Sequence, residues 1–370
     1  MTRESENRQP CLEQLFNPTQ NSLDFIRFFL ALLVVFSHSY PLGKFGNEQL
    51  LGTAQETYGG FAVQSFFVIS GFLITRSWLN KKSIWQFICN RFLRIFPGFW
   101  ICLLITIFFF APIVYLSEHG NLNQYFQNQE ASPISYFTRN FLLNIGQYNI
   151  AGLLKNNPYP NAFNGSLWTL IYEIKCYLMI VFLGCVGLVS RRIVLGLFIF
   201  LAFLYTLNIA VPGSAAKIFS PFQDIYLLNL TLYFFSGSVY FLYISKVIIN
   251  YRLLFTCLTI VLCSFLCNSY SFFAPFVVPY IVFWLACKLP LFKFGKYGDF
   301  SYGLYIYAFP VQQLLSFYGI HKQGFLIYFL TALFGSLTFA IPSYLWIEKP
   351  SMNLRLLISK FHFMNSVDKY

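Results

Sequence analysis

Repeated apolar runs, each close to the length that crosses a bilayer, constrain the fold of this chain most. We count about ten runs that approach the ~20 residues needed by a transmembrane helix. They lie near residues 23–42, 59–78, 96–115, 167–189, 193–211, 225–245, 253–269, 272–289, 300–318 and 324–346. Lipid allows only helices or closed barrels, and these runs are too long for barrel strands. The sequence therefore predicts an all-α fold, a polytopic transmembrane helical bundle.

The placement of the basic residues predicts the orientation of this bundle. The net charge of +12 would suggest a nucleic-acid partner if the charges were not placed along the chain. With a cytoplasmic N-terminus, 19 of the 25 Lys and Arg residues fall in cytoplasmic segments, and Lys175 falls within a span. The other five are outside: Lys44, Arg139, Lys155, Lys217 and Lys322. The positive-inside rule then places both termini in the cytoplasm, and no nucleic acid is needed to explain the charge.

The chain is organised as one membrane domain, predicted over residues 23–348. Cytoplasmic segments are expected before it (1–22) and after it (349–370), and the first 22 residues do not resemble a cleavable signal peptide. A long polar segment over residues 116–166 is predicted outside, where it could form a binding rim. Ser70-Gly71 predicts a close contact between two helices, as small residues allow in membranes. The nine cysteines contain no C-x-x-C pair, so neither a disulfide framework nor a zinc site is predicted.

Two ionisable residues within the first apolar run, Arg27 and His38, are the leading candidates for chemistry. Eleven residues separate them, which places them on nearly the same helix face and roughly 16 Å apart. Ionisable groups in hydrocarbon are costly and usually mark a pathway or a reaction site. A neutral imidazole at His38 would suit a general base. The alternative is structural, with His38 hydrogen-bonded inside the bundle and Arg27 paired with Asp24 at the membrane surface.

A basic cluster precedes and enters the third run. Arg91 and Arg94 are three residues apart on one helical face, and Lys81 and Lys82 precede them. Two guanidinium groups in this arrangement suit the oxygens of a phosphate. Cytoplasmic topology alone would explain the charges but not their spacing, and both explanations stay open.

A carboxylate lies near the start of the fourth run. Glu173 in an apolar helix must be neutral, paired or facing water. A pair with Lys175 is disfavoured because residues two apart on a helix point away from each other. The sequence therefore predicts an outward-facing polar cavity at Glu173, with Ser166, Trp168 and Tyr172 as substrate-binding candidates.

Six segments, taken together and in order, carry a family resemblance. They are LDFIR with His38 eleven residues beyond Arg27, FFVISGFLI, RFLRIFPGFW, SLWTLIYEIKCYL, SYGLYIYAFPVQQ and IEKP. This set resembles the membrane-bound acyltransferase 3 family, whose members O-acylate sugars and related hydroxyl compounds. The resemblance covers nearly the whole chain.

The resemblance implies an acyl-CoA donor that enters from the cytoplasm and an acceptor on the outer side. It also implies that His38 and Arg27 are essential, that Arg91 and Arg94 contribute to the CoA site, and that Glu173 belongs to the active cleft. Many relatives have a histidine where this chain has Ala308, so that histidine cannot act here. Some relatives also carry a fused hydrolase-like domain, and we expect this chain to transfer the acyl group itself or through a separate acyl-acceptor protein.

We therefore predict an integral-membrane O-acyltransferase of the bacterial cytoplasmic (inner) membrane. It would move an acyl group, most simply acetyl from acetyl-CoA and without a metal, to a hydroxyl of a surface polysaccharide or its lipid-linked precursor. His38 would act as base or carry the acyl group transiently. Two alternatives remain: a small secondary metabolite as acceptor, and a polysaccharide or glycolipid transporter or flippase without acyl-transfer chemistry. Paired half-repeats typical of many transporters are not seen in this sequence.

Overall fold

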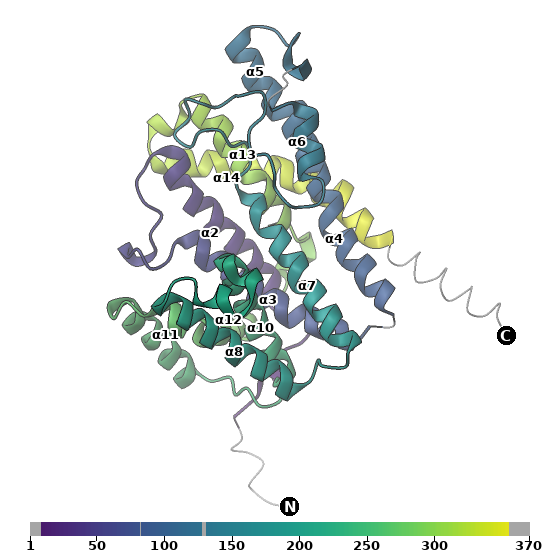
Figure 1. Ribbon diagram of the computed structural model, residues 1–370, viewed down its shortest axis with the longest axis vertical. Coiled ribbons are helices and arrows are strands. Elements are labelled where there is room, and N and C mark those ends of the chain that lie inside the picture. Colours follow the sequence, from purple (N-terminus) through teal and green to yellow (C-terminus); the bar gives the residue numbers. More distant parts are fainter. Residues whose placement is uncertain (1–8, 82, 128–130, 355–370) are drawn as a thin grey trace, which may run out of the picture. The chain divides into compact units, whose positions relative to one another are not determined.

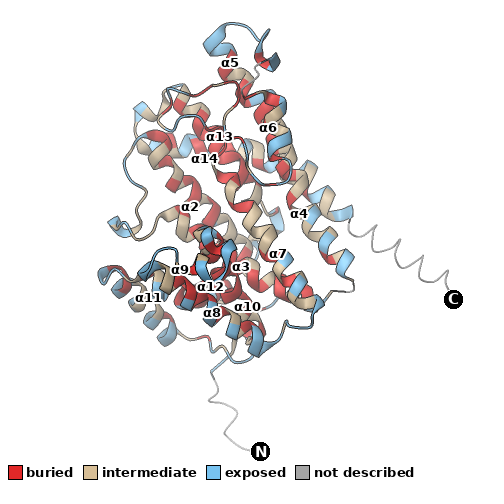
Figure 2. Ribbon diagram, viewed as in Figure 1, coloured by how far each residue is buried: buried red, intermediate tan, exposed pale blue. Residues whose placement is uncertain are grey.

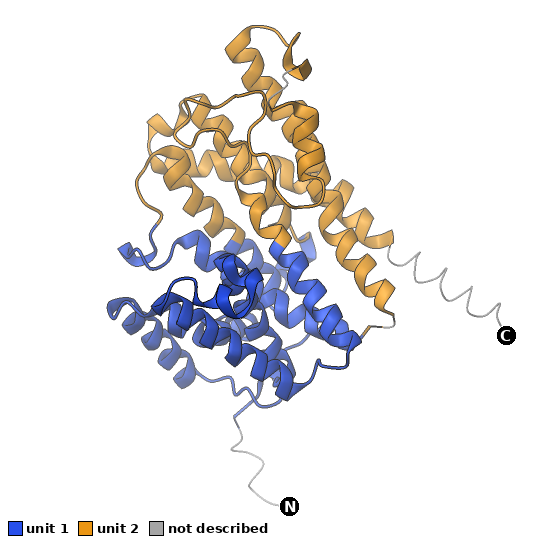
Figure 3. Ribbon diagram, in the orientation of Figure 1, with its two compact units in different colours: residues 1–30, 49–80, 172–297 blue, residues 31–48, 81–171, 298–370 orange. Residues whose placement is uncertain are grey.

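The computed structural model describes residues 9–81, 83–127 and 131–354 (Figure 1). These residues form helices and connecting loops, without a β-strand. The predictions for Lys82, for the first eight residues and for residues 355–370 of the tail fall outside the described residues. The chain divides into two compact units, shown in Figure 3 and described separately here. Helix α2 (Leu23–Gly43) contributes residues up to Leu30 to unit 1 and the rest to unit 2.

Eight helical segments in the described residues are long and apolar enough to cross a membrane. They are Leu23–Gly43, Tyr58–Leu79, Ile84–His119, Ser166–Cys185, Arg191–Ala210, Ile225–Leu242, Tyr270–Lys288 and Phe325–Leu354. This confirms the polytopic helical class but gives fewer spans than the ten expected. The runs near 253–269 and 300–318 form helices of only 16 and 17 residues, α11 (Tyr251–Leu266) and α13 (Ser301–Phe317). At 1.5 Å per residue they are shorter than the ~30 Å hydrocarbon core.

Unit 1 consists of residues 1–30, 49–80 and 172–297. It contains the first turns of α2 and the whole of α11. Its other elements are α1 (Leu12–Leu15), η1 (Leu50–Gly52), α3 (Tyr58–Leu79), α7 (Leu170–Cys185), α8 (Arg191–Ala210), α9 (Ser214–Ile218), η5 (Ser220–Gln223), α10 (Ile225–Leu242), α12 (Tyr270–Lys288) and η6 (Phe294–Tyr297). The most buried of these helices are α3, α10 and α12 (Figure 2).

The contact between α3 and α10 confirms the close approach predicted at Ser70-Gly71. A Cβ atom on Gly71 would lie 1.7 Å from the carbonyl oxygen of Phe234, and one on Gly237 would lie 1.9 Å from that of Val68. Only glycine fits at both positions, so the two backbones touch directly.

Unit 2 consists of residues 31–48, 81–171 and 298–370. It contains the later turns of α2 and the whole of α13. Its other described elements are α4 (Ile84–Ile105), η2 (Thr106–Phe110), α5 (Ala111–His119), η3 (Tyr125–Gln127), α6 (Pro133–Asn140), η4 (Ser166–Thr169), η7 (Ile320–Gln323), α14 (Phe325–Pro342) and η8 (Ser343–Glu348). Helix α4 starts well before the third apolar run because Ser83 caps it, accepting a hydrogen bond from the Gln86 amide. The predicted basic pair Arg91 and Arg94 therefore lies within a helix.

Candidate active site

Helix α13 fixes the part of α2 that carries His38. The side-chain amide (Nε2) of Gln312 donates hydrogen bonds of 2.9 Å to the Val35 carbonyl and to the Ser39 hydroxyl. One turn further along, the Ser316 hydroxyl donates to the Leu42 carbonyl at 2.5 Å. These groups are buried, where hydrogen bonds are costly to lose. The backbone on both sides of His38 is therefore held in one position.

The imidazole of His38 packs edge-on against the ring of Phe309, with ring centroids 5.3 Å apart. The residue as a whole is half-buried. Its Nδ1 atom is inaccessible, and no described residue forms a hydrogen bond with it. A buried ring nitrogen of this kind usually has a partner, so His38 is not explained as a satisfied structural histidine. This observation favours the functional interpretation of His38 over the structural one.

The Phe309 ring also contacts the loop before η4, at Tyr159 and at Gly165. The Tyr159 ring lies 5.6 Å from it, centroid to centroid. A Cβ atom on Gly165 would lie 2.6 Å from a ring atom of Phe309, so the chain passes close to the ring there. The next residue is Ser166, which is buried and whose hydroxyl has no hydrogen-bond partner among the described residues. The structure thus places the His38 ring, and the backbone just before the predicted substrate-binding Ser166, against one aromatic ring.

Further hydrogen bonds attach the loop before Ser166 to α13. The amide group of Gln313 donates to the Tyr159 carbonyl at 2.7 Å and to the Ala162 carbonyl at 2.6 Å. Asn164 donates to the Ile306 carbonyl at 2.8 Å. The predicted polar outer segment is therefore not a free rim in this region, because it is anchored along the buried helix α13. Trp168, in the short helix η4, is half-buried in the same unit.

A carboxylate missed in the sequence, that of Glu48, is hydrogen-bonded to Ser37, the residue just before His38. Ser37 donates a hydrogen bond to Glu48, which is in the loop after α2. Burial raises the pKa of the Glu48 carboxyl above its usual range, while the hydrogen bond from Ser37 partly opposes that change. The signal was a carboxylate placed soon after an apolar span, but its pairing with Ser37 depends on how the loop folds back.

The other predicted outer residues, Glu173 and Tyr172, belong to unit 1. Glu173 accepts a hydrogen bond from the Tyr177 hydroxyl and another from Ser70 at 3.5 Å. The Tyr172 hydroxyl donates to Asp224 at 2.7 Å. These contacts place Glu173 in a polar, half-buried setting, as expected for a carboxylate in an apolar helix.

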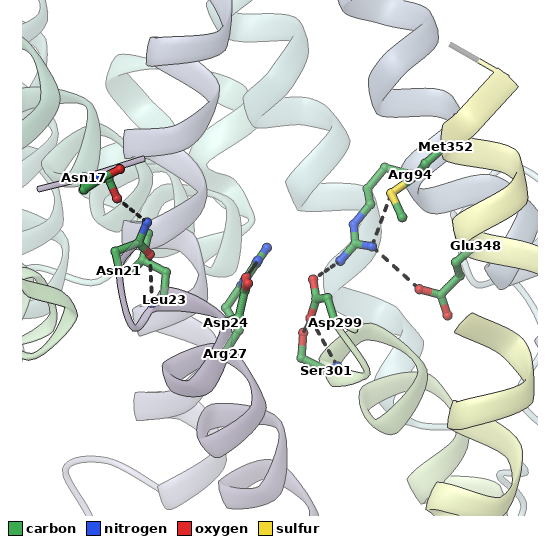
Figure 4. A network of polar contacts seen from close by, with 10 residues as sticks. All are labelled: Asn17, Asn21, Leu23, Asp24, Arg27, Arg94, Asp299, Ser301, Glu348 and Met352. Atoms are coloured by element: carbon green, nitrogen blue, oxygen red, sulfur yellow. Dashed lines mark hydrogen bonds and ion pairs between the residues drawn. The ribbon is translucent and has the colours of Figure 1, made fainter. Parts of the chain in front are cut away.

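Arg27 lies in unit 1 in the wall of a cavity of about 520 Å³, which we call the basic cavity. Its charged lining residues are Arg27, Arg76, Lys293, Lys296 and Asp24. Arg27 forms an ion pair with Asp24, the structural partner considered in the sequence (Figure 4). Arg76 and the two lysines form no ion pair with any described residue. Four basic groups around one acid therefore give the cavity a net positive charge.

The loop that carries the two lysines of the basic cavity is attached to the start of α2. The Phe294 ring packs against Phe25 and Phe28, at centroid distances of 5.5 and 5.3 Å. A Cβ atom on Gly295 would lie 2.0 Å from a carboxylate oxygen of Asp24, so the loop passes directly against the Asp24 side chain. The sequence did not show this juxtaposition, because about 270 residues separate the two segments along the chain.

Arg94, predicted to bind phosphate, is paired with two carboxylates in unit 2. It forms ion pairs with Asp299, just before α13, and with Glu348 in η8 at 3.7 Å (Figure 4). The Glu348 side chain is fully buried. Arg94 therefore joins α4 to the two segments SYG and IEKP, which the sequence could only list separately. Arg91 and Lys81 are half-buried in the same unit.

No group of three or more His, Cys, Asp or Glu side chains that could hold a metal ion occurs in the described ranges. Within unit 2 the structure packs His38 and the chain at Gly165, just before Ser166, against Phe309, and within unit 1 it groups Glu173 with Ser70 and Tyr177.

Comparison with known proteins gives consistent matches. The model of a family described as an acyltransferase domain matches residues 20–345. An O-acetyl transferase of Shigella phage Sf6 is 28% identical over 307 residues, which cover 80% of this chain and 85% of the phage protein. Nodulation protein 10 of Rhizobium leguminosarum bv. viciae is 26% identical over 361 residues, covering 91% of this chain and 94% of that protein. No solved structure matches the chain significantly.

Proposed function

This chain belongs to the acyltransferase 3 family and is an acyltransferase, and on that premise we propose that it transfers acetyl from acetyl-CoA to a glycan hydroxyl. The acceptor would be a surface polysaccharide or its lipid-linked precursor at the outer face of the bacterial inner membrane. The name of the phage relative supports acetyl as the group that is moved. The observation that carries the proposal is the buried Nδ1 of His38, which has no hydrogen-bond partner among the described residues, on an imidazole that packs against Phe309.

His38 acts in this proposal as the general base. It accepts the proton of the acceptor hydroxyl, whose oxygen attacks the thioester carbonyl of acetyl-CoA. The carbon–sulfur bond then breaks, CoA leaves as the thiolate, and the proton on His38 returns to the sulfur. An ester and free CoA are the products. The alternative, in which His38 carries the acetyl group transiently, uses the same contacts.

The donor phosphates require cations, and two basic groups of residues are available. The first is the basic cavity of unit 1, which contains Arg27 and whose volume lies within the ~300–1,000 Å³ range of small-molecule sites. Along the sequence of helix α2, eleven residues separate Arg27 from His38. The second is the pair Arg91 and Arg94 with the lysines before them, in which Arg94 already has two acidic partners.

The decisive experiment replaces His38 and measures acetyl transfer with membranes that contain the native acceptor. His38→Ala should lower the rate about 10²–10⁴-fold, the usual contribution of a positioned base, while the protein level in the membrane stays normal. Ser214→Ala serves as a matched control, because its hydroxyl is also buried without a partner among the described residues but lies in unit 1. A well-expressed His38→Ala protein with wild-type transfer would remove His38 from the mechanism. A wild-type protein that binds no acetyl-CoA at millimolar concentration would overturn the function itself.

A further inference from the structure

A second cavity, of about 660 Å³, lies within unit 2 and contains three lysines. We call it the lysine cavity. Its charged or titratable lining residues are Lys44, Lys155, Lys322, His321 and Glu118. None of the three lysines, nor Glu118, forms an ion pair with a residue that the structure describes. The lysine cavity is therefore a positively charged, solvated space large enough for one or two sugar units.

Membrane topology does not explain these lysines. The positive-inside rule depletes Lys and Arg from outer segments, and the ten-span topology predicted from the sequence assigns only five of them to the outside. Three of those five, Lys44, Lys155 and Lys322, line this one cavity although they are far apart in the sequence. Cations that are rare on a face and yet converge on one space point to an anionic ligand.

The backbone of the lysine cavity is built for this arrangement. Lys44 follows α2 with a φ of +60°, a left-handed position where glycine is the usual residue. His321 adds a buried Nδ1 atom that has no hydrogen-bond partner in the described part of the chain. This unpartnered nitrogen, next to three lysines, indicates that the cavity receives a polar ligand.

The lysine cavity is connected to His38 inside the same unit. Asn157 and Pro158 line the cavity, and Asn157 is held by Gln313 of α13 through hydrogen bonds of 2.9 and 2.8 Å. The next residue, Tyr159, contacts Phe309, against which His38 packs. Two ring contacts thus separate the cavity wall from the reactive imidazole.

We propose that the lysine cavity binds an anionic group of the acceptor and so selects acidic glycans for acetylation. This inference rests on the proposed function, because it treats the chain as an acyltransferase with His38 at the reaction centre. The anionic oxygens belong either to a sugar carboxylate or to the diphosphate of a lipid carrier. Lysines bind both kinds of oxygen as point charges.

The test compares the double variant Lys155→Gln/Lys322→Gln with wild type in acetyl transfer to native membranes. We expect the KM for acceptor to rise about tenfold, as when one charge-assisted hydrogen bond is lost, with acetyl-CoA binding unchanged. The wild-type KM should also rise between low salt and 0.5 M salt, about the range over which exposed charges become screened, and this dependence should weaken in the variant. Lys155→Arg/Lys322→Arg should keep most of the affinity. Lys217→Gln, an exposed outer lysine in unit 1, is the matched control and should resemble wild type.

Competition then identifies the source of the charge. Inhibition by oligogalacturonate but not by its methyl ester indicates a sugar carboxylate, whereas inhibition by inorganic pyrophosphate indicates the lipid carrier. The inference is overturned if the Lys→Gln double variant keeps the wild-type KM and salt dependence, or if neither anion competes. Loss of acetyl-CoA binding or of transfer in wild type would instead count against the proposed function.

Discussion

The ion-pair cluster around Arg94 makes the sharpest prediction, because the structure and the phosphate hypothesis disagree about what this residue does. In the structure Arg94 neutralises Asp299 and Glu348, whose side chains are 14% and 0% exposed. Arg94→Ala would leave a fully buried carboxylate without its cation. Removing one partner of a buried pair costs about 3–5 kcal/mol, and the lower end applies because the Arg94 side chain is itself 20% exposed.

A loss of about 3 kcal/mol should lower the melting temperature by roughly 4 °C, because the unfolding entropy of a 370-residue chain is large. Glu348→Gln added to Arg94→Ala should restore part of that loss, because a neutral amide needs no counter-charge. The assay is thermal unfolding of the purified proteins in detergent, together with acetyl-CoA titration at a temperature where all variants are folded. The reasoning is refuted if Arg94→Ala melts like wild type, or if the second substitution restores nothing. A normal melting temperature with lost acetyl-CoA affinity would assign Arg94 to the donor phosphates instead.

Three further predictions follow from single contacts. Gly71→Ala should lose about 1–3 kcal/mol of stability, because the added Cβ meets the Phe234 carbonyl, whereas Gly196→Ala, with open space around it, should be neutral or slightly stabilising in the same melting assay. The raised pKa of Glu48 means that the folded protein binds this proton more tightly than the unfolded one, so the stability it adds is present at low pH and lost as the pH rises through the folded pKa. As the pH rises from about 4 to about 7, the melting temperature of wild type should therefore fall relative to that of Glu48→Gln. Melting temperatures of the two proteins that change in parallel with pH would contradict this sign. Glu173→Gln should bind acetyl-CoA normally yet transfer acetyl poorly, and equal loss of both in calorimetry and transfer assays would make its role structural.

The helical membrane class was predictable because it depends on local sequence. Runs of about 20 apolar residues must form helices wherever lipid surrounds them, and each of the eight candidate spans overlaps one of those runs, although the span Ile84–His119 starts well before its run. The number of spans was less secure, since α11 and α13 form helices of only 16 and 17 residues, and apolarity alone does not separate a buried helix from a spanning one. The close contact at Gly71 was also predictable, because a glycine beside serine in an apolar helix has few other uses in a membrane.

The candidate site was only partly predictable, and the reason lies in how far apart its members are in the sequence. Patterning and resemblance together singled out His38, Arg27, Arg94 and Glu173, each from its own segment. The partners were invisible, because Asp299 and Glu348 lie more than 200 residues from Arg94. A local pattern reports the burial and the period of its own segment but not the identity of the segment that packs against it.

By itself, then, the sequence determined that this chain is a helical membrane protein, which segments are helices, and that an arginine and a histidine share one helix. Those properties follow from hydrophobicity and helix geometry over neighbouring residues. Only the tertiary structure decided that His38 packs against Phe309, that Arg94 pairs with two carboxylates, and that three lysines far apart in the sequence line one cavity. Such groupings arise when helices that are distant in the sequence pack together. The packing energy that selects them is spread over many side chains, so it cannot be read from any single segment.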